Sequence, residues 1–127
     1  MSKTTNLAPL KIGSDHGYVF HVRNEDESES IDVAGWAISF MLKYRVSDLD
    51  AAALLTKTVA GGGIAIGGAY NSVPANNLQR VTVTIADTDT DALAPRVVEW
   101  ELKRMDSNFE TPLGDGVVEL RRGVHRT

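Results

Sequence analysis

A strict alternation of large apolar residues with smaller or polar ones runs from position 36 to 44, and it constrains the fold more than any other feature of the chain. Successive side chains of an extended strand point to opposite faces, so the alternation places one large apolar set on a single face. That set is Trp36, Ile38, Phe40, Leu42 and Tyr44. The segment therefore predicts a strand whose inner face lies in a hydrophobic core.

The same period of two recurs along the chain. Further strands are predicted at Tyr18–Val22, Arg80–Ala86, Val97–Lys103 and Val117–Arg121, with another at Leu7–Ile12. The segment from Leu54 to Val59 fits either a helix or a strand, and its β-branched residues favour the strand. Strands therefore dominate the predicted secondary structure.

Turn signals separate these strands. The acidic segment Asn24–Ser30 predicts a solvated hairpin loop, and Gly61–Gly63 predicts a turn. Asp106–Asn108 and Gly114–Gly116 predict two late hairpins. A helical turn capped by Ser47 is expected, and a second is expected at the start of the segment from Asp87 to Pro95.

Short strands at this spacing predict an all-β fold, an antiparallel β-sandwich of about 7–9 strands with one or two short helical turns. Residues 1–13 are expected to form an N-terminal arm and first edge strand, residues 14–122 the sandwich domain, and residues 123–127 a C-terminal tail. The whole chain of 127 residues is then one domain with two short extensions.

Composition narrows the possible functions. The chain has no cysteine, which removes disulfides, thiolate zinc sites and cysteine nucleophiles. A net charge of −4 argues against a nucleic-acid partner, because that affinity comes from lysine and arginine. No apolar run reaches the length of a signal peptide or a membrane span, so neither secretion by that route nor a membrane partner is expected.

Three carboxylates at alternate positions, Asp87, Asp89 and Asp91, match the start of a calcium loop. The rest of that loop is missing, because Ala92 stands where a glycine is required and Val98 where a bidentate glutamate is required. Capping of a short helical turn is the favoured role of these residues, and neither a metal nor any other cofactor is expected.

Other candidate catalytic features also have structural explanations. His16, His21 and His125 have no partner at metal-ligand spacing and are expected to be surface or turn residues. No nucleophile-elbow motif occurs, and the glycine run from Gly61 to Gly68 lacks the ending of a phosphate-binding loop. Trp36 and Trp100 fall on apolar faces, which favours core positions over a sugar-binding platform. An enzyme is therefore not expected.

The order of motifs resembles that of small virion proteins of tailed bacteriophages and prophages. Those motifs are Asp32–Trp36, Ser47–Lys57, Ile64–Ile66, Val81–Leu93 and Gly116–Leu120. The nearest resemblance is to immunoglobulin-like β-sandwiches such as the N-terminal domain of upper baseplate proteins, and it covers residues 14–122. The chain departs from many relatives at Ala94–Arg96, where they have a Pro-Gly turn.

The resemblance implies a structural subunit of a phage particle, placed in the tail or baseplate, at the head–tail junction, or as a capsid-decorating or fibre-attachment protein. Its partners would be other virion proteins and copies of itself, and it would be assembled into the virion in the cytoplasm of the host bacterium. The alternative is a β-sandwich module that binds the host surface or a glycan.

Contacts in such a particle are expected from an N-terminal arm, Lys3–Leu10, that adds to a neighbour's sheet and from two loops, a first at Asn24–Ser30 and a second at Tyr70–Asn77. The expected contact residues are Lys3, Leu7, Leu10, Glu25, Asp26, Tyr70 and Asn71. Deletion of residues 1–8 is then expected to leave the domain folded but to reduce its incorporation into particles.

Overall fold

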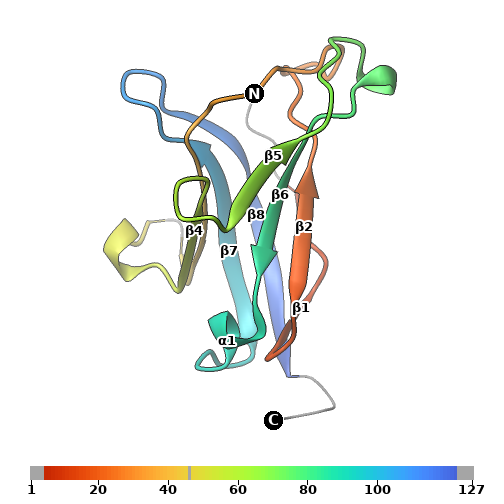
Figure 1. The fold of residues 1–127 in the computed structure, drawn as a ribbon. Helices are drawn as coiled ribbons and strands as arrows, with labels where there is room; N and C mark the ends of the chain where they lie inside the picture. The colour runs from red at the N-terminus through yellow and green to blue at the C-terminus, as the bar shows by residue number, and fades with distance from the viewer. Residues whose placement is uncertain (1–4, 46, 123–127) are drawn as a thin grey trace.

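Two facing β-sheets form the molecule in a computed structural model that describes residues 5–45 and 47–122 (Figure 1). One sheet has five strands in the order β1-β8-β7-β3-β4, and the other has three in the order β2-β6-β5. The strands are β1 (Leu10–Ile12), β2 (His16–Phe20), β3 (Ile38–Lys43), β4 (Leu55–Thr58), β5 (Ile64–Gly67), β6 (Arg80–Ile85), β7 (Arg96–Arg104) and β8 (Thr111–Arg122). The predicted all-β sandwich is confirmed, with eight strands in the described part of the chain.

The core lies between the sheets and follows the predicted alternation. Ile38, Phe40 and Leu42 of β3 are buried, and so are the alternate residues of the strands that surround them. From β6, β7 and β8 these are Val81, Val83, Ile85, Val98, Trp100, Leu102, Val118 and Leu120. The ambiguous segment after Leu54 is a strand, β4, as its β-branched residues predicted.

The two ends of the predicted core strand are corrected. Trp36 is only half-buried and Tyr44 is exposed, because β3 begins after Trp36 and ends before Tyr44. Outside the strand, the pleat no longer directs these side chains into the core. Instead, the guanidinium of Arg104 lies 4.0 Å from the centre of the Trp36 ring, and that of Arg96 lies 4.0 Å from the centre of the Tyr44 ring.

The first strand also differs from prediction. β1 pairs in parallel with β8, with Leu10 opposite Leu120, whereas the other strand pairs are antiparallel. Leu10 is fully buried. β1 is the first edge strand expected within residues 1–13, and its Leu10 packs in the same core as the strands after residue 14.

One of the predicted late hairpins exists and the other does not. The segment from Asp106 to Asn108 forms the β7–β8 hairpin, with Asn108 at a φ of 69°. Gly114–Gly116 lies inside β8, which continues through it. The predicted glycine turn is found between β4 and β5, and it carries the chain from one sheet to the other.

Three short helical turns occur in the described residues: η1 (Asp50–Ala52), η2 (Pro74–Asn76) and α1 (Asp87–Thr90). The first and third were predicted, but Ser47 does not cap η1, whose N-cap is Leu49 without a side-chain hydrogen bond. None of the helices described is long and apolar enough to cross a membrane.

Candidate functional site

The two loops that were predicted to carry contacts lie together at one end of the sandwich (Figure 1). The hydroxyl of Tyr70 donates a hydrogen bond of 2.9 Å to the carbonyl of Ser30. The backbone N–H of Ser30 donates one of 2.9 Å to the carbonyl of Ser72. The structure therefore brings Glu25 and Asp26, on the first loop, to the same end as Tyr70 and Asn71.

A buried polar network lies beneath the loops and connects them to β6. Two side chains of this network, those of Asn77 and Gln79, are buried. The Asn77 side-chain carbonyl accepts from the N–H of Asn71 at 2.9 Å, and the Gln79 carbonyl accepts from the N–H of Val33 at 3.0 Å. The Gln79 amide also donates to Asp32 at 3.0 Å. Because buried amides that satisfy backbone groups fix the chain around them, this network holds both loops in place.

His21 belongs to the same network. Its Nε2 lies 2.7 Å from Ser30 Oγ and 2.9 Å from Asn77 Nδ2, while its Nδ1 lies 3.2 Å from Arg23 Nη2. Amide and guanidinium nitrogens only donate, so both ring nitrogens face donors. Burial lowers the pKa of His21, and the charges of Arg80 and Arg23 lower it further. The neutral ring is thus the form that the network holds.

The His21–Ser30 pair has the geometry of a base beside a hydroxyl, but Ser30 is only 3% exposed. An attacking oxygen must reach a substrate, and this hydroxyl is enclosed by its own hydrogen-bond partners. The pair is therefore a structural part of the loop support.

Apolar side chains point outward from the second loop. Leu78 is 68% exposed and Val73 is 49% exposed, and the Tyr70 ring is also exposed. The loop is closed by a hydrogen bond of 2.9 Å from the N–H of Leu78 to the carbonyl of Ala69. Gly68 permits this close approach, because it has a φ of +93° and a Cβ there would collide with the Leu78 carbonyl.

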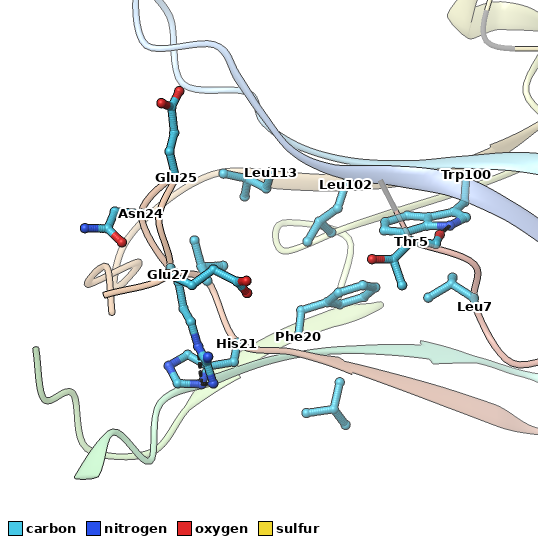
Figure 2. Close-up of a pocket in the computed structure, with 14 residues that line it drawn as sticks. Thr5, Leu7, Phe20, His21, Asn24, Glu25, Glu27, Trp100, Leu102 and Leu113 are labelled. Atoms are coloured by element: carbon cyan, nitrogen blue, oxygen red, sulfur yellow. Dashed lines mark hydrogen bonds between the residues drawn. The ribbon is translucent and has the colours of Figure 1, made fainter. Parts of the chain in front are cut away.

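A pocket of about 430 Å³ opens between the sheets beside the first loop. Figure 2 shows Phe20 of β2 facing Leu102 and Trp100 of β7 across this space. Leu113 of β8 completes an apolar floor. Four polar residues also line the pocket: His21, Arg23, Glu25 and Glu27. No local sequence motif indicates this pocket, since its walls come from four separate segments.

The N-terminal segment is used within its own chain. The N–H of Thr5 donates to the carbonyl of Asp115 at 2.7 Å, and that of Leu7 to the carbonyl of Val117 at 3.0 Å. Leu10 is in the core, which overturns its prediction as a contact residue. Deleting residues 1–8 would remove contacts with β8, contrary to the expectation that this segment is free. Lys3 lies outside the described residues.

The three aspartates near α1 do not converge on a metal. Asp89 accepts from the N–H of Ala86 at 2.7 Å and pairs with the Lys57 ammonium at 2.7 Å. Asp87 accepts from the N–H of Thr88 at 2.8 Å. Within residues 5–45 and 47–122, no group of three or more possible ligands could hold a metal ion. The Asp89 carboxylate has the helix-capping role that the sequence favoured.

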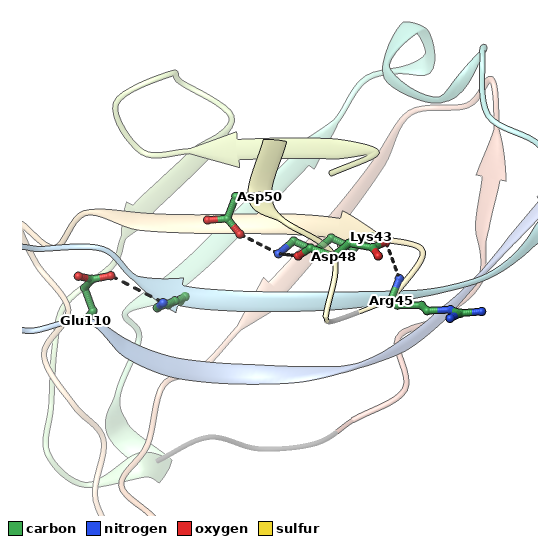
Figure 3. Close-up of polar contacts among 6 residues, drawn as sticks. Lys43, Arg45, Asp48, Asp50 and Glu110 are labelled. Carbon is green, nitrogen blue, oxygen red and sulfur yellow. Dashed lines mark hydrogen bonds and ion pairs between the residues drawn. The ribbon is translucent and has the colours of Figure 1, made fainter. Parts of the chain in front are cut away.

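A further polar cluster lies on the outer face of the five-stranded sheet (Figure 3). The Lys43 ammonium donates to the carbonyl of Asp48 at 3.0 Å and to the carboxylate of Asp50 at 2.7 Å. The Asp48 carboxylate accepts from the N–H of Arg45 at 3.2 Å. These bonds hold Asp48 and Asp50 beside the end of β3, so the cluster is structural.

Comparison of the chain with protein families and with curated proteins finds no match to either.

Proposed function

We propose that this chain is a structural protein of a bacteriophage virion that acts through protein–protein assembly contacts. It would be a subunit of the tail or baseplate, the head–tail junction, or a capsid decoration or fibre attachment. The observation that carries the proposal is the set of apolar side chains exposed on a firmly held loop, namely Tyr70, Val73 and Leu78.

Exposed apolar groups on a fixed loop favour association. Burying such groups against a partner releases free energy, at about 25 cal/mol for each Å² of apolar surface. The hydrogen bond that Asn77 accepts from Asn71 and the one that Tyr70 donates to Ser30 already fix the loop, so little further ordering is needed on binding. Leu78 and Val73 are thus presented as ready contacts.

The edges of the two sheets offer additional contacts. β4 lies at one edge of the five-stranded sheet, and β2 and β5 are the edges of the three-stranded sheet. Edge strands present backbone N–H and carbonyl groups that can pair with another chain. The other edge of the five-stranded sheet is β1, and the arm before it is hydrogen-bonded to β8 of its own chain, so the arm is not proposed as a contact.

The assignment to a virion rests on the resemblance of the motifs between Asp32 and Leu120 to those of phage structural proteins. It is tested by purifying phage particles from the strain that encodes the chain, washing them in high salt and probing them with an antibody. We expect the protein to remain with the particles. Its absence from washed particles would overturn the proposal, and glycan-array binding would then favour the host-surface alternative.

The contact loop is tested separately with Val73→Asp and Leu78→Asp. Each places a charge where an apolar contact is proposed, so we expect at least about tenfold less protein in the particles. Leu49→Asp is the matched control, because Leu49 is 79% exposed and is the N-cap residue of η1, outside the contact loop. Equal incorporation of all three variants, with unchanged thermal stability, would exclude this loop as the contact.

A further inference from the structure

The pocket between the sheets has an acidic loop beside it. Its floor is apolar, from Phe20, Leu102 and Leu113. The neighbouring loop carries four exposed acidic side chains, those of Glu25, Asp26, Glu27 and Glu29. A segment that fits this end would combine an apolar side chain with positive charge, because opposite charges guide and orient association.

The chain contains such a segment at the other end of β8. Arg121 and Arg122 close the strand and are exposed. The sequence continues Gly-Val-His-Arg-Thr, which adds one apolar residue, Val124, and a further arginine, Arg126. No acidic residue occurs from 121 to 127. This basic segment matches the acidic loop and its apolar pocket in chemistry.

The placement of the two features decides between binding within one chain and binding between chains. Leu113 and Gly114 of β8 line the pocket, whereas Arg122 ends the same strand at the opposite end of the molecule (Figure 1). Gly114 and Arg122 are eight residue steps apart, which span about 26 Å as a strand. The five residues after Arg122 can reach at most about 18 Å. The basic segment cannot reach the pocket of its own chain.

We propose that residues 121–127 of one copy dock on the acidic loop and pocket of a second copy. Each contact then joins two different surfaces, the basic segment of one copy and the acidic loop and pocket of the next, and every copy carries both surfaces. Such a contact repeats from copy to copy and builds a ring or an open filament. The proposal deepens the proposed assembly function by naming a second copy as partner, and it rests on that function only for its biological setting.

The test is a charge exchange measured by sedimentation velocity on the full chain at low salt. Glu25→Lys with Glu27→Lys makes a loop variant, and Arg122→Glu with Arg126→Glu makes a tail variant. Wild type is expected to self-associate, and each variant alone to associate at least about tenfold more weakly. An equal mixture is expected to recover association, because each variant loop then meets a tail of opposite charge.

A wild type that stays monomeric, or a mixture that stays dissociated while both variants remain folded, would overturn the proposal. If the loop variant does not fold, a peptide of residues 119–127 is titrated into the full chain carrying Trp36→Phe. Trp100 lines the pocket and becomes the only tryptophan. We expect its emission to shift with this peptide and not with the charge-reversed one, and equal responses would overturn the proposal.

The two proposals fail separately. Particles that contain the protein regardless of the tail charges would leave the virion function standing and remove the copy-to-copy contact. Charge-dependent association in solution without incorporation into particles would support the copy-to-copy contact and overturn the virion function.

Discussion

At some positions of this protein, the residue type that fits is determined by a segment far away in the sequence. Gly116 lies inside β8, where a Cβ would collide with the carbonyl of Thr5. That carbonyl accepts a hydrogen bond of 2.8 Å from the indole N–H of Trp100. The glycine thus leaves room for the N-terminal segment, and this explains why the Gly114–Gly116 stretch is not the turn that its composition predicted.

Gly116→Ala is expected to destabilise the fold by about 1–3 kcal/mol, since it displaces Thr5 and breaks the bond to Trp100. Urea unfolding gives the free energy, and Trp100 fluorescence reports the lost contact. Gly35→Ala is the matched control, because Gly35 also has a positive φ, of +79°, but has open space around its Cβ position. Equal losses in both variants would show that backbone strain alone is responsible.

His21 predicts a pH dependence. Its pKa is lowered in the folded state, so the unfolded chain binds more protons when the pH falls below about 6.5. The stabilisation is complete above that pH and is lost as the pH falls through the folded pKa. We expect the free energy of unfolding to decrease from about pH 7 to about pH 5, and the decrease to be smaller in His21→Gln. Parallel curves for the two proteins would contradict this role.

Among the strands, β1 differs most from the role that the sequence predicted for it. Its three residues pair in parallel with β8, and Tyr18 donates a hydrogen bond of 2.8 Å to the carbonyl of Ala8 just before it. Burial raises the pKa of Tyr18 to about 12, so this phenol stays a donor at neutral pH. These contacts make the N-terminal segment part of the sandwich.

Leu10→Ala is therefore expected to cost about 2–5 kcal/mol, as large-to-small changes in a core do. Leu49→Ala, at an exposed leucine, is expected to change stability by less than about 0.5 kcal/mol. Chemical denaturation of both variants measures the difference. A small effect at Leu10 would restore the hypothesis that the arm is free to join a neighbour's sheet.

At the scale of the whole molecule, one core joins the two sheets. Phe20 of the three-stranded sheet lies 5.5 Å from Trp100 of the five-stranded sheet, and Tyr18 lies 6.2 Å from Phe40, both measured between ring centres. Neither sheet can bury its inner face without the other.

The chain is consequently expected to unfold in one cooperative transition. Thermal melting followed by far-ultraviolet circular dichroism should coincide with melting followed by Trp100 fluorescence, with Trp36→Phe in place to isolate that signal. An earlier transition in either probe would show that one sheet melts separately.

The sequence by itself determined the strands, their inward faces and most of the turns, because these depend on alternation and on glycine, proline and polar residues close in the chain. Ile38, Phe40 and Leu42 are predictable in this way. The candidate site was only partly predictable. The sequence identified the acidic loop and the loop that carries Tyr70, but it did not predict that the two loops lie together.

Only the tertiary structure decided the parallel pairing of Leu10 with Leu120, the support of the loops by Asn77 and Gln79, and the pocket below them. Each of these depends on groups from segments far apart in the chain. A local pattern records which face of a strand is apolar, but it does not record which distant segment will cover that face. The contact loop, the pocket and the separation of the pocket from the basic segment therefore follow from how the sheets are assembled.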